Sequence, residues 1–134
     1  MKRFDFDTIL FPFHYTSWYA GNFGPQVLEM ARQKEMGIMA LKAMAKHRWP
    51  KGMKRADRPF STWYVPLHEE DEARKGLRFS LSHPIATAIP PGDSELFSLA
   101  LKLAKDFKPM NDDEIMEMKK MGLEERPLFK YPQG

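Results

Sequence analysis

The sequence predicts an α/β fold in which short parallel strands alternate with helices. Three observations support this prediction: short apolar runs, amphipathic segments between them, and Gly or Pro residues at the boundaries. Strands that are joined through helices pair in parallel. At 134 residues the chain has the length of one domain with a sizeable core, so we expect residues 1–134 to form a single domain.

The first strand is predicted over residues 4–13. Apolar and acidic residues alternate at its start, and residues 9–13 are then continuously apolar. This change is typical of a strand that enters a buried parallel sheet. Pro12 favours the end of the strand or a sheet edge. The aromatic segment 15–23 then predicts a loop.

A helix is predicted to begin at Pro25, because proline suits the first helical position, and to end at Gly37, which suits the residue after a helix. The apolar residues 38–44 predict a second buried strand. Several prolines and glycines follow, so residues 45–68 are predicted to be a long loop that is rich in basic and aromatic residues.

Three helices and one strand are predicted in the remainder of the chain. A run of acidic residues favours a helix start because it suits the helix dipole. Asn111 and Glu114 have the spacing of a capping box. The predicted helices are 69–81, 94–107 and 111–122, the strand is 85–89, and residues 123–134 are an irregular tail.

Composition excludes several classes of chemistry. The chain has no cysteine, which excludes disulfides, thiolate metal sites and cysteine nucleophiles. Its ten methionines are spread out and are typical of core residues rather than of a metal site, so no metal is expected. No apolar run is long enough to span a membrane, and the N-terminus lacks the apolar segment of a secretory signal. We therefore expect a cytoplasmic protein with no membrane partner.

Four segments carry a resemblance to a known family. They are residues 6–14 (FDTILFPFH), 27–44, 76–94 (GLRFSLSHPIATAIPPGDS) and 111–114. In this order they resemble the sixth strand, the following helix and seventh strand, the helix and eighth strand, and the start of the closing helix of the aldo/keto reductase barrel. Together they cover roughly residues 4–122.

The resemblance implies a partial (β/α)8 TIM-type barrel made of the last three βα units and a closing helix. It implies NAD(P)H-dependent reduction of a small carbonyl substrate, with NADP or NAD as the cofactor. The family's catalytic Asp, Tyr, Lys and His come from the first half of the barrel, so no catalytic residue is assigned here. The chain alone is expected to be inactive, with the missing N-terminal half or further copies of itself as its partner.

The family's cofactor site can be transferred to this chain residue by residue. Leu10 and Phe97 replace the family's Gln and Arg, which leaves the choice between NAD and NADP open. The positions that correspond to the cofactor-binding segments after the seventh and eighth strands are Leu41, Lys42, Met44, Pro90, Pro91, Gly92, Asp93 and Ser94.

The residues themselves leave alternatives open. A strand that leads through a glycine turn into a helix is a ready anion site, although residues 92–94 also suit an ordinary helix cap. Four aromatic residues suit either a substrate mouth or packing on loops or at an interface: Trp18, Tyr19, Trp63 and Tyr64. Exposed sheet edges would favour self-association without catalysis. Residues 1–60 hold eleven Lys or Arg against five Asp or Glu, so nucleic-acid binding through residues 42–58 is a weaker alternative.

Overall fold

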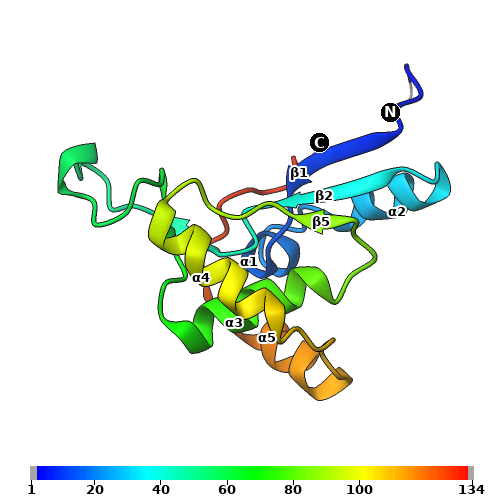
Figure 1. The fold of residues 1–134 in the computed structure, drawn as a ribbon. Coiled ribbons are helices and arrows are strands. Elements are labelled where there is room, and N and C mark those ends of the chain that lie inside the picture. Colours follow the sequence, from blue (N-terminus) through cyan, green and yellow to red (C-terminus); the bar gives the residue numbers. More distant parts are fainter. Residues whose placement is uncertain (1–2, 133–134) are drawn as a thin grey trace.

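The computed structural model of the chain describes residues 3–132 (Figure 1). The strands are β1 (Thr8–Pro12), β2 (Gly37–Leu41), β3 (Ala45–Arg48), β4 (Tyr64–Pro66) and β5 (Thr87–Ala88). The helices are α1 (Tyr15–Tyr19), α2 (Pro25–Gln33), α3 (Glu70–Leu81), α4 (Ser94–Lys105) and α5 (Asp112–Glu124), with one 3-10 turn, η1 (Arg55–Asp57).

Two small sheets organise these elements. The first has three parallel strands in the order β1-β2-β5, and its central pairs are Leu10 with Met39 and Met39 with Thr87. The second is an antiparallel pair of β3 and β4. Three residues separate β2 from the hairpin. They form a tight turn in which the backbone N–H of Ala45 donates to the Lys42 carbonyl at 2.9 Å. The hairpin therefore lies beside the carboxyl end of the parallel sheet.

The helices pack on one face of the parallel sheet, and no helix lies above β1 and β2 in Figure 1. Alternation along the strands places Phe11, Ile38 and Ala40 on the covered face, where each is at most 6% exposed. Phe13 and Phe79 continue this core toward the helices. The core is therefore one-sided with respect to the sheet.

Helix α5 is tied to the rest of the molecule through its start. Asn111 caps the helix by accepting from the Glu114 backbone N–H at 2.9 Å, and the Glu114 side chain accepts from the Asn111 N–H, which confirms the predicted capping box. Both Glu114 carboxylate oxygens also accept from Arg78 of α3, at 2.7 and 3.0 Å. Such two-point pairs are geometrically specific, so they fix α5 relative to α3.

A buried cluster around His14 links three parts of the chain. The His14 ring is 0% exposed, with Nδ1 3.0 Å from Thr16 Oγ1 and Nε2 2.9 Å from Ser17 Oγ. Ser17 Oγ also accepts from the Phe129 backbone N–H at 3.0 Å. Burial, with a smaller effect of the positive charge of Lys42, lowers the pKa of His14 to about 3. A neutral histidine thus joins the end of β1 to α1 and to the C-terminal segment.

The prediction of a partial TIM-type barrel is wrong. Within residues 3–132 the parallel sheet has three strands, the other two strands form a separate antiparallel pair, and no barrel is closed. The α/β alternation and the parallel pairing of the three strands are as expected. The barrel was predicted from the resemblance alone. The observed sheet is small, since β5 contributes two paired residues.

Two segments that were predicted to be loops contain regular structure. Residues 15–19 form α1, since the buried hydrogen bonds of His14 with Thr16 and Ser17 hold a helical turn that has no apolar periodicity to reveal it. Residues 45–68 include β3 and β4, which pair with an irregular register between Ala45 and His47. Such short strands lack the alternation that sequence patterns require.

The remaining predicted elements differ mainly at their ends. The strand expected over residues 4–13 is limited to Thr8–Pro12, and the tail begins after α5 ends at Glu124. Parts of the predicted range 1–134 and of the tail 123–134, namely residues 1–2 and 133–134, lie outside the described residues. Within residues 3–132 we find no helix whose length and apolar content would let it cross a membrane.

Gly21 is expected to be intolerant of a side chain. A Cβ there would overlap the carbonyl oxygen of Phe129 and lie 2.7 Å from that of Ser17, and backbone atoms cannot easily move away. We expect Gly21→Ala to lower the free energy of unfolding by about 1–3 kcal/mol in urea denaturation. Gly92→Ala is the control, because a Cβ at Gly92 meets nothing within 4 Å. Equal urea midpoints for the two variants would contradict the close contact of Gly21 with the backbone of Phe129.

His14 is expected to make stability depend on pH between about 3 and 6.5. Its pKa is about 3 in the folded protein and 6.5 as a free group, so the unfolded chain binds more protons in this range. Stability is therefore complete above pH 6.5 and falls on acidification, by up to about 1.4 kcal/mol per pH unit. Burial also lowers the pKa of His83, which acts in the same direction.

The measurement is urea unfolding at several pH values for the wild type, His14→Gln and His47→Gln. His47 is the control because it is partly exposed and does not belong to the buried His14 cluster. We expect a shallower pH slope for His14→Gln and the wild-type slope for His47→Gln. Identical slopes for all three proteins would show that His14 is not held neutral.

Candidate functional site

The candidate site is a polar cavity of about 320 Å³ at the carboxyl end of the parallel sheet. The carboxyl ends of parallel strands are the usual place for ligands in α/β proteins. The cavity combines basic and aromatic side chains from the β2–β3 turn and the hairpin with the backbone of Gly92 after β5. Its lining residues are Lys42, Arg55, Arg58, Ser61, Thr62, Trp63, Tyr64 and Gly92.

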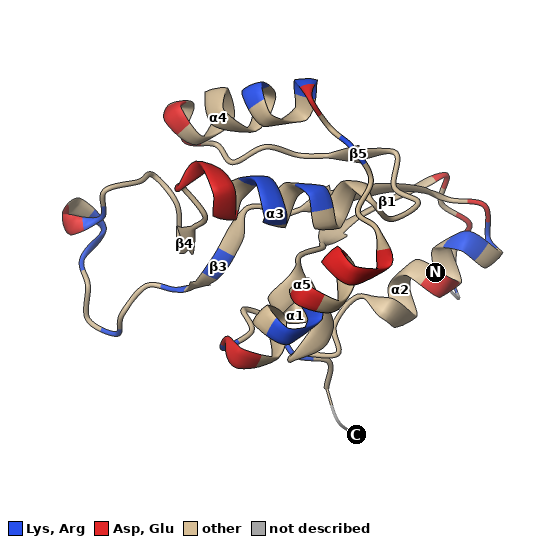
Figure 2. Cartoon of the chain, turned by 90° about the horizontal axis from the view of Figure 1, so that it is seen from below, with Lys and Arg blue, Asp and Glu red and all other residues tan. Residues whose placement is uncertain are grey.

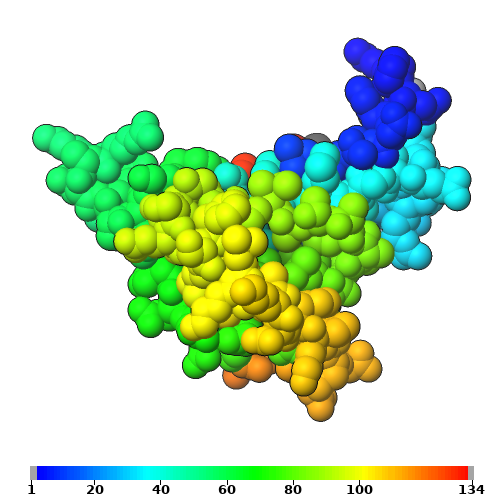
Figure 3. Space-filling view, viewed as in Figure 1, coloured from blue at the N-terminus to red at the C-terminus, as the bar shows by residue number. Residues whose placement is uncertain are grey.

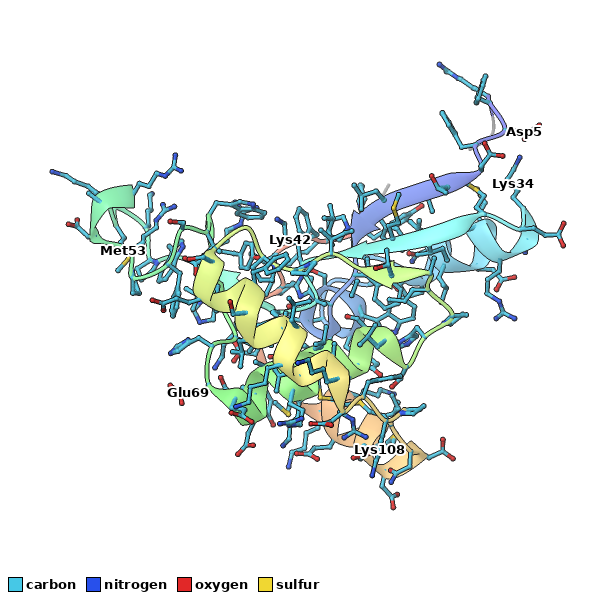
Figure 4. The ribbon with its side chains drawn as sticks, in the orientation of Figure 1. Asp5, Lys34, Lys42, Met53, Glu69 and Lys108 are labelled. Carbon is cyan, nitrogen blue, oxygen red and sulfur yellow. The ribbon has the colours of Figure 1, made fainter. Side chains whose placement is uncertain are left out.

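Lys42 is positioned by an unusual backbone turn. Its φ is 67°, in the left-handed region that residues other than glycine seldom adopt. The turn ends β2, and the carbonyl of the preceding Leu41 accepts from the Phe13 N–H at 2.7 Å. Figure 4 shows Lys42 at the opposite end of the strands from Asp5 and Lys34. The turn therefore directs an ammonium group to the carboxyl edge of the sheet.

The Lys42 ammonium lies against two aromatic rings. Its Nζ is 4.9 Å from the ring centre of Tyr64 and 5.5 Å from that of Trp63. Among residues 3–132 no carboxylate lies within 4.0 Å of it, and partial burial lowers its pKa. Cation–π contacts orient the ammonium without neutralising its charge, so it stays available to an anion.

Arg58 supplies a second cation with unused donors. Its terminal nitrogens lie 3.5 Å from the carbonyls of Thr62 and Met53, which is the weak limit of hydrogen bonding. Its Nε is buried and has no hydrogen-bond partner among the described residues. A buried unpaired donor is costly, and an incoming acceptor would relieve it. Figure 2 shows that the loop around Arg58 projects from the hairpin end of the molecule and is rich in Lys and Arg.

Asp93 occupies the helix start that was predicted as an anion cradle. Its carboxylate accepts from the backbone N–H groups of Glu95 at 3.1 Å and Leu96 at 3.3 Å, so it is the N-cap of α4. The other carboxylate oxygen accepts from the Ser61 N–H at 2.8 Å. These three bonds lower the pKa of Asp93. An external anion at this helix start would have to displace the chain's own carboxylate.

The structure separates the residues that the resemblance assigned to the cofactor. Lys42 and Gly92 line the polar cavity. Met44 is 1% exposed in the core and, with Pro90 and Pro91, borders a separate apolar cavity of about 230 Å³. The others lie at the ends of elements and outside both cavities: Leu41 at the end of β2, Asp93 at the cap of α4 and Ser94 at its first residue.

The basic and aromatic residues of the hairpin loop are the part of the site that sequence reasoning did not assemble. Trp63 and Tyr64 had been interpreted as a possible substrate mouth, and residues 42–58 as a basic segment. The structure brings Arg55, Arg58 and Trp63 to Lys42. The sequence signal for these residues is the mixture of basic and aromatic residues within the predicted loop 45–68. Such a mixture does not determine which side chains contact one another.

Other polar groups are less suited to chemistry. The His14 ring is fully buried and already paired with two hydroxyls, so no substrate could reach it. Burial, with a smaller effect of Asp93, raises the pKa of Tyr64 to about 12, which makes it a weak proton donor. No group of three His, Cys, Asp or Glu side chains within the described part of the chain could hold a metal ion.

The chemistry of this cavity suits a ligand with an anion and a planar ring. The two cations would meet phosphate oxygens, which arginine and lysine bind well. The indole of Trp63 is 43% exposed and offers a face for stacking. A phosphate-bearing nucleotide has both groups, so the lining residues match the phosphate and one ring of such a ligand.

The chain was compared with known proteins at three levels. No protein-family model, curated protein or solved structure matches it.

Proposed function

We propose that this chain binds a nicotinamide dinucleotide, NADP or NAD, in the cavity at the carboxyl end of the sheet. It would supply this cofactor site to carbonyl reduction of the aldo/keto reductase type without contributing a catalytic residue. The observation that carries the proposal is the Lys42 ammonium, which has no carboxylate partner and lies beside the exposed ring of Trp63.

Charge supports the phosphate part of the proposal. Lys42, Arg55 and Arg58 have no carboxylate within 4.0 Å among residues 3–132. Three neighbouring cations repel one another, and a bound phosphate would remove this repulsion. The terminal nitrogens of Arg58, whose bonds to Thr62 and Met53 are long, would also gain a closer acceptor. The cations would therefore favour a ligand with at least one phosphate.

Shape supports the nucleotide part. The cavity volume of about 320 Å³ is at the lower end of the range for small-molecule sites, which suits one nucleotide half of a dinucleotide. The ring of Trp63 meets two rings edge-on, that of Tyr64 at 5.5 Å and that of Phe129 at 5.9 Å between centres, so its position is held from two sides. An adenine or nicotinamide ring could stack on the exposed indole, while the cations hold the phosphate.

Loss of the Lys42 ammonium is expected to weaken binding without unfolding the protein. Lys42→Gly removes the charge, and glycine adopts the left-handed backbone at this position without strain. A hydrogen bond to a charged group contributes about 1.5–3 kcal/mol, so Kd should rise by about 10- to 100-fold. Isothermal titration calorimetry with NADPH and with NADH measures this change.

Lys51→Ala is the matched control for that variant. Lys51 belongs to the same basic segment but borders a different groove, beside residues 124–130. We expect its Kd to stay within about twofold of the wild type, since screening makes a distant exposed charge weak. Equal losses in both variants would indicate non-specific attraction, and no binding of either dinucleotide to the wild type would overturn the proposal.

Asp93→Ser is expected to act in the opposite direction. Serine keeps an N-cap for α4 but removes the negative charge that lies next to the cavity and raises the pKa of Tyr64. We expect NADPH to bind several-fold more tightly, because repulsion is reduced and the Ser61 N–H is released. The same titration checks this outcome. Weaker binding would mean that Asp93 itself holds the ligand, as it would by accepting from a ribose hydroxyl.

A further inference from the structure

The β3–β4 hairpin concentrates positive charge. Residues 45–66 contain six Lys or Arg against one Asp, a net charge of +5, whereas the whole chain has a net charge of +3. The rest of the chain is therefore net acidic. Lys46 is paired with Glu72 at 3.1 Å. The other five have no carboxylate within 4.0 Å among residues 3–132: Arg48, Lys51, Lys54, Arg55 and Arg58.

The loop of this hairpin stands away from the body of the molecule. Figure 3 shows it projecting at the left, and Figure 2 shows that its charged residues are mostly Lys and Arg. Lys51, Lys54 and Arg55 are exposed on it. A cluster of unpaired charges of one sign creates a field that attracts and orients a partner of the opposite sign. The loop therefore favours a polyanion.

A groove of about 850 Å³ lies between residues 47–51 of the hairpin and residues 124–130. Trp49 borders it on the hairpin side, and Arg126 and Lys130 border it on the other side. Acids are present as well, but over the loop and the groove together the unpaired bases exceed the acids by seven to four. The four acids are Asp57, Asp93, Glu124 and Glu125.

Two tryptophans lie at the end of the hairpin ladder. Trp49 directly follows β3 and Trp63 directly precedes β4, so they are the next opposite residues of the antiparallel pair. Trp49 Nε1–H donates to the Thr62 carbonyl at 2.8 Å, which holds its ring in place. The guanidinium of Arg58 is 5.9 Å from the ring centre of Trp49, and that of Arg48 is 5.9 Å from the ring centre of Trp63. Each indole is thus combined with a cation.

We propose that the hairpin loop and this groove bind a single-stranded nucleic acid. Its phosphates would lie along the unpaired Lys and Arg side chains, and its bases would stack on the two indoles. Proteins that bind single strands combine a basic track with aromatic rings in this way. The bases of a duplex are already stacked on one another and offer no free face to an indole. The combination of rings and cations therefore favours a single strand over a duplex.

The hairpin supplies what the sequence lacked for this interpretation. Nucleic-acid binding was the weaker alternative because residues 45–68 were predicted to be a loop without a frame, whereas the ladder brings both rings and their cations together. The proposal does not depend on the dinucleotide proposal, because it uses Lys51, Lys54 and Trp49. None of these three lines the polar cavity.

The first test is the fluorescence anisotropy of labelled oligo(dT) and oligo(U), each about 12 nucleotides long, titrated with the full chain at about 50 to 200 mM salt. We expect Kd to rise steeply with salt, because each neutralised phosphate contributes about 0.7 to the slope of log Kd against log salt. Lys51→Ala/Lys54→Ala should reduce this slope by about 1.4 and raise Kd at low salt about 10-fold.

Lys105→Ala/Lys108→Ala is the matched control. Both lysines are exposed and have no carboxylate within 4.0 Å among residues 3–132, and Figure 4 shows Lys108 on the opposite side of the molecule from Met53 of the loop. We expect the wild-type slope for this variant. NADPH binding should stay within about twofold of the wild type in the loop variant, since screening weakens distant exposed charges. The nucleic-acid site and the dinucleotide site can therefore fail separately.

The second test separates stacking from loop structure at Trp49. Trp49→Phe loses the hydrogen bond to Thr62 but keeps an aromatic ring, whereas Trp49→Leu loses both. We expect Kd for oligo(dT) to rise about 5- to 100-fold in Trp49→Leu and to stay within about threefold of the wild type in Trp49→Phe. Equal losses in the two variants would show that no base stacks on this ring. Circular dichroism checks that both variants fold.

Several results would overturn the proposal. One is a wild type that binds neither oligonucleotide at low salt, including one that binds anionic lipid vesicles instead. Another is equal affinity for a duplex of the same length, which would mean that charge alone is responsible. Equal losses in Lys51→Ala/Lys54→Ala and in Lys105→Ala/Lys108→Ala would place the attraction on the whole surface rather than on the hairpin.

Discussion

The left-handed turn at Lys42 is the constraint on which the candidate site depends. It ends the central strand β2 and starts the hairpin strand β3 three residues later. The base of the hairpin is then closed by the Leu67 N–H, which donates to the Met44 carbonyl at 2.7 Å. A non-glycine residue in this conformation costs about 1–3 kcal/mol, and such strain is concentrated at functional sites. Glycine would adopt this conformation without strain, but the position carries a lysine. Its ammonium contacts the rings of Trp63 and Tyr64.

The short parallel sheet organises both the core and the candidate site. The buried face is covered by helices and by the neutral His14 cluster, which fixes the C-terminal segment through Ser17 and Phe129. The open face carries uncharged side chains, among which Leu10 is 50% and Ile89 is 37% exposed. At the basic end the cavity offers cations and an exposed indole to a ligand. A small fold therefore combines a core on one face of its sheet with a basic and aromatic cavity at the carboxyl end.

Sequence patterns predicted the elements with clear periodicity or capping chemistry. The capping box of Asn111 and Glu114 and the parallel strands β1, β2 and β5 follow from local signals. The barrel was wrong, because a resemblance among segments does not determine how many strands pair. Helix α1 was missed since it is held by buried hydroxyl–imidazole contacts rather than by an apolar stripe. For the site, Lys42 and Gly92 were predicted, but the contribution of Arg58 and Trp63 depends on how the hairpin folds back.

The most direct test of the central claim is a titration of the ¹⁵N-labelled chain with NADPH, followed by amide and indole resonances. The account predicts shifts concentrated at Lys42, residues 61–64 and Gly92, including the indole N–H of Trp63, with little change in α5. Shifts centred on the other basic groove at residues 47–51 and 124–130, or no shifts at millimolar cofactor, would contradict it.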